Sequence, residues 1–413
     1  MPRHPLALTA WAALSAAAAD QQGGETDGAG RGGGCLVWLH SDSEGRLPSL
    51  LALAERLERE DGVACLLTLP AEAAARPTCA AALASGAIRP SLRPVPSEAP
   101  AAVQAFLDRW RPDAAVWCGG GLRPNLLARA ARAGLPLVLA EGAPNPRLLA
   151  QGGWMPGLSA AVVPLFARAL VTGRVSADRL ARAGLPPERI ELRPPLEAPP
   201  VVLPCNERER RDLAALIGAR PVWLAADLPL SELAQVAAAH RLASRAAHRL
   251  LLLIAPRDPD EGSAMARGLT EAGLRVALRA EGAEPEEDAA VYLADGTGET
   301  GLWLRLAPVA YLGGTLPGGP GGRHPFEAAA LGSALIHGPV TAPHTGAWGR
   351  LDAAGGARAV RNGVELGHAV ESLLAPDRAA ASARAAWDIA TEGAETLNRL
   401  HDLVRAALDG ALR

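Results

Sequence analysis

A glycine-rich segment that leads directly into a helix is the part of this sequence best suited to bind an anion. It reads YLGGTLPGGPGGRHPFEAAALGSALIHGP, from Tyr311 to Pro339. The pattern predicts a strand over 309–312, a loop, a helix that begins at Pro325 with Glu327 in its first turn, and a second short strand. Glycines before a helix let free N–H groups approach a phosphate, and the helix dipole favours the same charge. We therefore predict phosphate binding here, and a surface loop with ordinary helix capping is the alternative.

Composition limits the classes of protein that fit this chain. Its 413 residues are enough for two or three domains. It has 41 basic and 44 acidic side chains, and every basic one is Arg. This balance gives no general attraction to nucleic acid, so we predict no nucleic-acid partner. The five cysteines lack the close spacing of metal sites and disulfide frameworks, so we predict no metal site and a reducing, cytoplasmic environment; they are Cys35, Cys65, Cys79, Cys118 and Cys205.

An apolar segment lies near the N-terminus. It reads PLALTAWAALSAAAA over Pro5–Ala19 and is followed by a polar, glycine-rich stretch. It is shorter than the roughly 20 apolar residues of a membrane-spanning helix. A signal-like segment, an interfacial helix and a disordered tail all fit this pattern. We interpret residues 1–34 as a tail with weak, peripheral membrane association and favour this interpretation over export.

Short apolar runs alternate with amphipathic helices from Cys35 onward. Such alternation is typical of parallel strands buried on both faces, and hence of a doubly wound α/β domain. A proline-rich stretch, RPPLEAPPVVLPC, interrupts the alternation, which then resumes. We predict an N-terminal domain over 35–192, a linker over 193–205 and a C-terminal domain over 206–413 that ends in a long helix. Two such domains are expected to leave a binding cleft between the carboxyl ends of their sheets.

Six further motifs occur in order along the chain: VWLHSDSEG, LRPNLLARAARAGLPLVLA, SADRLARAG, RPVWLAA, LLLIAPRDP and GETGLWLRLAPVAYLGG. Together with the glycine-rich segment they resemble the Kdo transferases, bacterial enzymes that move 3-deoxy-D-manno-octulosonic acid (Kdo) from CMP-Kdo onto lipid A precursor. The resemblance extends from about Leu36 to Leu403. It implies a GT-B fold, in which two doubly wound Rossmann-like domains face each other across a cleft.

The resemblance also implies an activity. The protein would be an inverting, metal-independent glycosyltransferase that releases CMP and uses no cofactor besides its donor substrate CMP-Kdo. Because the donor's own bond to phosphate supplies the driving force, the protein mainly has to hold the phosphate and position the acceptor. Its partners would be the CMP-sugar donor and lipid A precursor or another glycan acceptor, in the cytoplasm or at the cytoplasmic face of the inner membrane. The alternative is a divergent paralogue that binds a nucleotide or nucleotide sugar without Kdo transfer.

Two segments of the C-terminal domain match places where the family contacts CMP. Pro256 and Arg257 end a strand there, and an Arg side chain suits a phosphate because it donates two parallel hydrogen bonds. Gly298 and Glu299 match the next nucleotide-contacting turn. The resemblance therefore assigns these four residues to the donor, and an ordinary surface charge is the alternative for Arg257.

A third donor segment begins the helix after the glycine-rich loop. His324 to Glu327 match it, and Glu327 resembles the residue that would accept hydrogen bonds from ribose hydroxyls. Arg323 stands where the family usually has a His, and His324 stands where an Asn would cap the helix better. Helix capping is the alternative role for Glu327.

The catalytic positions depart from the family pattern. In HSDSEGR, Arg46 occupies the position of the family's general base, a Glu. A guanidinium group is always protonated and cannot accept a proton. In CGGGLRPN, Gly119 and Gly121 occupy two acidic positions, and Glu197 stands about where the family has a Lys.

A replacement base must therefore come from another residue if the chain transfers Kdo. Glu44 lies two residues before Arg46, and His40 ends the first predicted strand with a side chain that titrates near neutral pH. We predict that Glu44 or His40 acts as the base. For His40 the alternative is a strand-end histidine that packing and hydrogen bonds satisfy.

Overall fold

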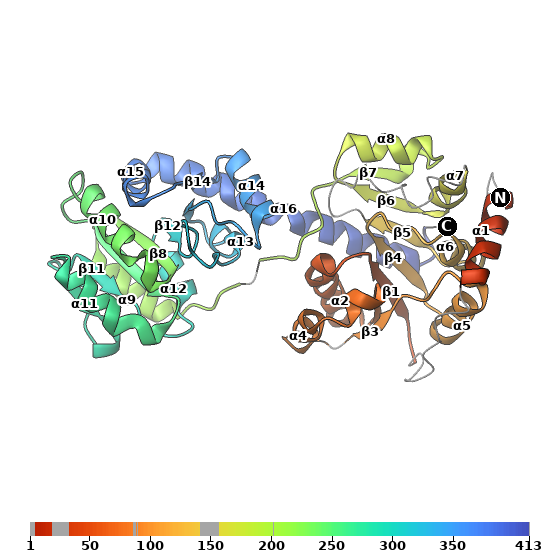
Figure 1. Cartoon of the computed structure of the whole chain (residues 1–413), viewed down its shortest axis with the longest axis horizontal. Helices are drawn as coiled ribbons and strands as arrows, with labels where there is room; N and C mark the ends of the chain where they lie inside the picture. The colour runs from red at the N-terminus through yellow and green to blue at the C-terminus, as the bar shows by residue number, and fades with distance from the viewer. Residues whose placement is uncertain are drawn as a thin grey trace. The chain divides into compact units, whose positions relative to one another are not determined.

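The computed structural model describes residues 5–18, 33–85, 88, 90–140, 157–200 and 202–412. The chain divides into two compact units (Figure 1). Unit 1 comprises Met1–Pro199 with Glu392–Arg413, and unit 2 comprises Pro200–Thr391. Each unit is an α/β layer structure around its own parallel sheet.

In its described residues, unit 1 contains a seven-stranded sheet in the order β3-β2-β1-β4-β5-β6-β7, and all its neighbouring strands are parallel. Because successive side chains of a strand point to opposite faces, Trp38 enters one core, and Val37 and Leu39 enter the other. The strands are β1 Leu36–Ser41, β2 Ala64–Leu69, β3 Ser91–Pro94, β4 Ala114–Cys118, β5 Leu137–Ala140, β6 Arg168–Val171 and β7 Ile190–Leu192.

Helices cover both faces of this sheet, as the apolar strands require. Helices α1, α5, α6 and α7 gather on the Trp38 face (Figure 1), whereas α2, α4 and the second half of α16 pack on the opposite face. The helices are α1 Pro5–Ala18, α2 Leu47–Asp61, α3 Ala71–Ala74, α4 Pro77–Ser85, α5 Pro100–Trp110, α6 Pro124–Arg132, α7 Leu158–Val162, α8 Arg174–Arg182 and α16 Pro376–Leu408.

Unit 2 repeats this architecture with a seven-stranded parallel sheet in the order β10-β11-β9-β8-β12-β13-β14. Helices α10, α11 and α15 pack on the face that buries Trp223, and α9, α12, α13 and α14 pack on the other. The strands are β8 Val222–Leu228, β9 Leu251–Pro256, β10 Val276–Leu278, β11 Val291–Leu293, β12 Val309–Leu312, β13 Ala334–His337 and β14 Ala357–Ala359. The helices are α9 Glu207–Ile217, α10 Leu233–Ala243, α11 Gly262–Glu271, α12 Thr300–Leu306, α13 Pro325–Ala329, α14 Thr345–Ala353 and α15 Gly363–Leu373.

In each sheet the strand order reverses beside the first strand of the unit. In unit 1, β2 and β3 lie in this order on one side of β1, and β4 lies on the other side of β1. In unit 2, β9, β11 and β10 lie in this order on one side of β8, and β12 lies on the other side of β8. The loops that follow the two neighbouring strands at such a point diverge from each other, and ligands of doubly wound folds bind between them. The switch points are therefore β1/β4 in unit 1 and β8/β12 in unit 2.

The C-terminal helix differs from the predicted domain organisation. The boundary between Pro199 and Pro200 falls within the predicted linker over 193–205, but residues 392–413 belong to unit 1 and not to the predicted domain over 206–413. The reason is packing, because Leu400 and Leu403 are buried in the core that α2 also lines. Helix α16 therefore contributes to both units.

The predicted tail over 1–34 differs as well, since part of it is a docked helix. Leu8 of α1 is buried in the core of unit 1, and Trp11 Nε1 donates a hydrogen bond to Glu98 Oε2 at 2.7 Å. Residues 19–32 lie outside the described residues. In the described part of the chain, no helix combines the length and the apolar character that crossing a membrane takes.

Candidate functional site

The glycine-rich loop follows β12 at the switch point of unit 2, and its backbone packs closely on itself. Gly314 has φ +77°, and a Cβ atom there would lie 2.5 Å from the carbonyl oxygen of Gly321. A Cβ atom at Gly319 would lie 2.4 Å from the carbonyl oxygen of Gly314, and one at Gly338 would lie 2.0 Å from that of Thr315. Side chains are therefore excluded at these positions, because the turns of the loop touch each other and the segment after β13, to which Gly338 belongs.

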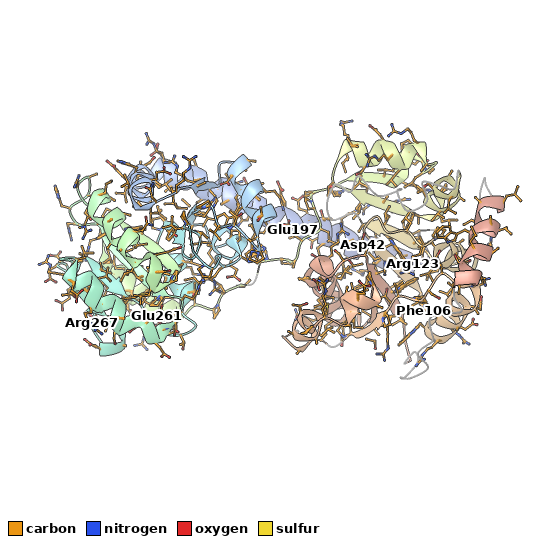
Figure 2. The ribbon with its side chains drawn as sticks, viewed as in Figure 1. Asp42, Phe106, Arg123, Glu197, Glu261 and Arg267 are labelled. Carbon is orange, nitrogen blue, oxygen red and sulfur yellow. The ribbon has the colours of Figure 1, made fainter. Side chains whose placement is uncertain are left out.

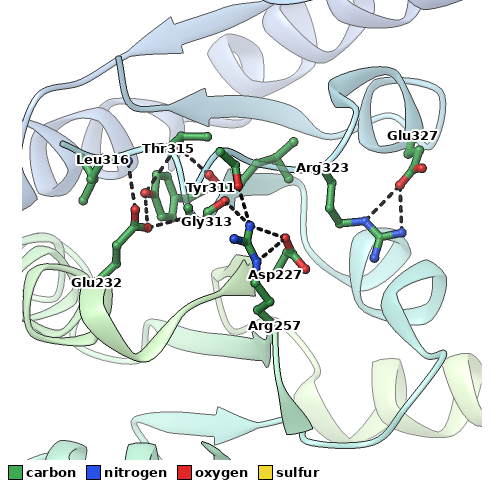
Figure 3. Close-up of polar contacts among 12 residues, drawn as sticks. Asp227, Glu232, Arg257, Tyr311, Gly313, Thr315, Leu316, Arg323 and Glu327 are labelled. Carbon is green, nitrogen blue, oxygen red and sulfur yellow. Dashed lines mark hydrogen bonds and ion pairs between the residues drawn. The ribbon is translucent and has the colours of Figure 1, made fainter. Parts of the chain in front are cut away.

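A buried carboxylate holds this loop at its start. Glu232 is 4% exposed and ends the short 3-10 helix Leu230–Glu232 after β8. Its carboxylate accepts hydrogen bonds from the Tyr311 hydroxyl at 2.6 Å and from the backbone N–H groups of Gly314 and Leu316, both at 2.9 Å (Figure 3). Burial and the nearby Glu232 carboxylate raise the pKa of Tyr311. The sequence analysis missed Glu232, although an acidic residue shortly after an apolar strand was a usable signal.

Arg257 holds the same loop from its other end. It follows Pro256, the last residue of β9, and donates to Asp227 Oδ2 from Nε at 3.0 Å and from Nη2 at 2.6 Å. Nη2 also donates to the carbonyl oxygen of Gly321 at 2.6 Å (Figure 3). Asp227 itself has φ +54°, a conformation that few residues other than glycine adopt. The ion pair thus fixes the guanidinium of Arg257 beside the loop, and its phosphate contact remains a prediction.

Helix α13 begins where the loop ends. His324 Nδ1 accepts a hydrogen bond from the N–H of Phe326 at 3.2 Å, so a His provides the cap for which Asn was expected to be better. Burial and the neighbouring ring of His344 lower the pKa of His324 to about 4, which keeps it neutral at pH 7. Glu327 Oε2 accepts from Arg323 Nε at 3.0 Å (Figure 3). Glu327 is therefore oriented at the end of the loop, and its ribose contact remains a prediction.

The predicted turn at Gly298 and Glu299 lies in a separate ion-pair cluster. Gly298 has φ +76°, and Glu299 accepts from Arg279 Nε at 2.7 Å and from Nη2 at 2.6 Å. Arg279 also pairs with Glu209, and its guanidinium lies over the ring of Trp303 at 5.1 Å. Hydrogen bonds to Glu299 raise the pKa of Arg279. Arg279 and Glu209 line a cavity of about 640 Å³, a volume that suits a small ligand.

A second carboxylate lies at the switch point of unit 1. Asp42 follows β1, and its Oδ2 accepts from the backbone N–H groups of Gly120 at 2.9 Å and Gly121 at 3.3 Å. Its Oδ1 accepts from Arg46 Nη1 at 2.7 Å. Gly119 has φ +112°, and a Cβ atom there would lie 2.2 Å from Asp42 Cγ. The residue at the predicted base position, Arg46, is thus the partner of a carboxylate that the sequence analysis missed.

His40, one of the two predicted bases, is a core residue. It is 2% exposed, its Nδ1 lies 2.9 Å from Thr68 Oγ1, and its ring lies 3.8 Å from that of Trp117. Burial, followed by the positive charge of Arg123, lowers the pKa of His40 to about 3. An imidazole with this pKa is a weak base, and its surroundings agree with the alternative of a histidine that packing satisfies.

Glu44, the other predicted base, lies in the short 3-10 helix Glu44–Arg46 after β1. Its side chain is 33% exposed, forms an ion pair with Arg76 and accepts from Thr78 Oγ1 at 3.3 Å. The base role of Glu44 remains a prediction. Among the described residues, no group of three or more His, Cys, Asp or Glu side chains is placed to hold a metal ion.

Comparisons with known proteins agree on one family. Residues 14–196 match the family described as 3-deoxy-D-manno-octulosonic-acid transferase (kdotransferase). The 3-deoxy-D-manno-octulosonic acid transferase of Bordetella pertussis is 31% identical over 383 residues, which cover 89% of this chain and 87% of that protein. The transferase of the same name from Haemophilus influenzae is 26% identical over 325 residues, which cover 76% of this chain and 74% of that protein.

A solved structure adds information on the fold alone. The crystal structure of MurG from Acinetobacter baumannii, 12% identical in sequence, matches with a TM-score of 0.50 over 89% of this chain and 100% of that chain. This likeness and the two parallel sheets confirm the predicted GT-B type of fold with two doubly wound, Rossmann-like units.

Replacing Glu232 by Gln should destabilise unit 2. Gln keeps the size of the side chain, but it replaces one carboxylate oxygen by an NH₂ group. In the wild type both oxygens accept hydrogen bonds, so in the variant this NH₂ group would face another donor. We expect the free energy of unfolding to fall by about 1–3 kcal/mol in urea denaturation, without a change in slope. Glu371→Gln, at a side chain 45% exposed on α15, should change it by less than about 0.5 kcal/mol. Equal stability of Glu232→Gln and the wild type would contradict this account of the loop.

The buried His40 should make stability depend on pH. Its folded pKa of about 3 lies below the unfolded value of about 6.5, so the unfolded state gains protons first as pH falls. Stability from this group is therefore complete above about pH 6.5 and is lost toward pH 3, by at most about 1.4 kcal/mol per pH unit. Urea denaturation from pH 7 to 4 should give a flatter dependence for His40→Gln than for the wild type. The exposed His248 provides the control, since His248→Gln should keep the wild-type dependence.

Proposed function

The chain belongs to the 3-deoxy-D-manno-octulosonic acid (Kdo) transferase family, and on this premise we propose that it transfers Kdo from CMP-Kdo to lipid A precursor, a step of lipid A and lipopolysaccharide biosynthesis. The protein is a glycosyltransferase with a nucleotide-sugar donor and a glycan acceptor. The similarity to the Bordetella pertussis transferase carries this conclusion because it extends through both units. A paralogue that only binds a nucleotide is not favoured, because the matching family and the similar proteins are named as transferases.

Unit 2 supplies the groups that we assign to the donor. Arg257 is held beside the glycine-rich loop by Asp227, so its charge is oriented before a phosphate arrives. Such preorganised groups stabilise the charge that develops on a leaving phosphate without having to reorient during the reaction. Glu327 is placed at the end of the same loop, where its carboxylate would accept hydrogen bonds from ribose hydroxyls.

The proposal includes no metal ion and no cofactor besides the donor. CMP leaves with the electron pair of the bond that it formed with Kdo, and a guanidinium can compensate the charge on its phosphate. Arg257 is the residue that we assign to this task, and the dipoles of the loop would assist it.

A direct assay tests the function. The purified full-length protein is incubated with CMP-Kdo and lipid A precursor, and the products are read by mass spectrometry. The proposal expects a lipid product that has gained Kdo, together with free CMP. Release of CMP at the same rate without acceptor, and no modified lipid with it, would overturn the function.

Binding of CMP should stabilise unit 2 through Glu327. At a hundredfold excess over its Kd, CMP should stabilise the protein by about 2.7 kcal/mol, which a thermal-shift measurement detects. Glu327→Ala should reduce this stabilisation strongly, because a hydrogen bond to a charged group contributes about 1.5–3 kcal/mol. Glu371→Ala on α15 of the same unit is the matched control and should keep the shift. An undiminished CMP shift in Glu327→Ala would remove Glu327 from the donor site.

Helix α1 suggests where the protein meets its lipid substrate. Leu6 and Leu14 of this helix are 83% and 50% exposed, while Leu8 is buried against unit 1. The exposed positions between them carry no charge; they are Thr9, Ala10 and Ala13. We propose that this face makes a peripheral contact with the inner membrane on its cytoplasmic side, as an interfacial helix would.

Charges on the outer face of α1 should weaken this contact. We expect the double variant Leu6→Glu/Leu14→Glu to co-sediment less than the wild type with vesicles of phosphatidylethanolamine and phosphatidylglycerol, because it adds two charges and removes two apolar side chains. Val364→Glu introduces one such charge at a position 58% exposed on unit 2 and should bind like the wild type. Equal loss in both variants would indicate a general charge effect and contradict the role of α1.

A further inference from the structure

We infer that Asp42 is the catalytic base of this transferase and accepts the proton of the attacking acceptor hydroxyl. This inference rests on the proposed function and names a residue that the sequence analysis did not single out. Asp42 lies directly after β1, at the point where the strand order of unit 1 reverses between β1 and β4. Loops at such a point hold the ligands of doubly wound folds.

The reaction step is balanced with one base and no further reactant. The acceptor oxygen forms a bond with the anomeric carbon of Kdo, and the bond from that carbon to the phosphate oxygen breaks. CMP leaves with the electron pair of the broken bond. The hydroxyl proton passes to a carboxylate oxygen of Asp42, which releases it to water after the product has left.

The contacts of Asp42 hold its carboxylate in one orientation. Oδ2 accepts from Gly120 N at 2.9 Å and from Gly121 N at 3.3 Å, and Oδ1 accepts from Arg46 Nη1 at 2.7 Å. A carboxylate oxygen has two lone pairs, so Oδ2 is fully used by the two N–H groups, whereas Oδ1 accepts one bond and keeps a lone pair for a proton. Arg46 is then a positioning residue, since it touches the base and cannot take a proton itself.

The absence of a side chain at Gly119 leaves the space that the carboxylate of Asp42 occupies. A Cβ atom at Gly119 would lie 2.2 Å from Asp42 Cγ and 2.2 Å from its Oδ2. A side chain at 119 and the present position of Asp42 therefore exclude each other. The two acidic side chains that the resemblance places at 119 and 121 are missing, and the opposite loop supplies a carboxylate in their stead.

Exposure separates Asp42 from His40, and its backbone contacts separate it from Glu44. The side chain of Asp42 is 24% exposed, whereas His40 is 2% exposed and has a pKa of about 3. Glu44 is 33% exposed, but its carboxylate contacts the side chains of Arg76 and Thr78, whereas backbone N–H groups hold that of Asp42. Asp42 therefore combines access with a fixed orientation. Figure 2 labels Asp42 on unit 1. It also labels Arg123, the last residue of the loop between β4 and α6 that contains Gly120 and Gly121.

Substitution and chemical rescue test the assignment. Asp42→Ala should lower kcat for transfer by about a hundred- to ten-thousand-fold and leave the KM for CMP-Kdo and the CMP-induced thermal shift unchanged. It also leaves a cavity that keeps its anion donors, the N–H groups of Gly120 and Gly121 and the guanidinium of Arg46. Added formate should restore part of kcat in a saturable way. Nitrate has the same charge and a similar planar shape but is a far weaker base, so it should not.

Matched variants complete the test. Asp178→Asn, at an exposed carboxylate of unit 1, should keep wild-type kinetics, and Asp42→Glu should retain more activity than Asp42→Asn. Rescue of Asp42→Ala by nitrate as well as formate would mean that the carboxylate only supports the loop, which overturns the assignment. So would wild-type kcat in Asp42→Ala combined with its loss in Glu44→Gln. Wild-type protein without transfer would overturn the proposed function and this assignment together, whereas active wild type and active Asp42→Ala would overturn the assignment alone.

Discussion

A carboxylate removed from water must find hydrogen-bond donors, and this constraint shapes the glycine-rich loop of unit 2. Glu232 finds them in the Tyr311 hydroxyl and in two backbone N–H groups of the loop after β12. The loop can offer these groups only in one conformation, which depends on glycines where its turns touch. The side chains that follow the loop, among them Glu327, are positioned as a consequence. The conformation of this loop thus depends on one buried side chain.

The same arrangement occurs in both units. In unit 1 an acidic side chain after the central strand β1 binds backbone N–H groups of the loop after β4, and in unit 2 an acidic side chain after the central strand β8 binds those of the loop after β12. In each case the two loops flank the point where the strand order reverses. The difference lies in exposure, because Glu232 is 4% exposed while the side chain of Asp42 is 24% exposed. The buried carboxylate therefore acts on the fold, and the accessible one is available for chemistry.

The position of Asp42 also changes how the departures from the family pattern in unit 1 are interpreted. Taken singly, an Arg at the position of the family base and glycines at two acidic positions imply a lost activity. In the structure they form one group, in which Gly119 makes room for the carboxylate of Asp42 and Arg46 binds it. A carboxylate is still present at this switch point, but a different loop carries it.

The sequence alone determined the layer architecture, because apolar runs and helices of the right length permit few alternatives to two doubly wound sheets. It also determined the strand, loop and helix from 309 to 337, since Pro325 and the glycines act within a few residues of themselves. Only the tertiary structure decided which backbone N–H groups Asp42 and Glu232 bind, because these partners lie 78 to 84 residues away along the chain. It also decided that α16 completes unit 1 and that His40 is buried. Local patterns report on neighbours in sequence, whereas burial and hydrogen bonding depend on which distant segments the fold brings together.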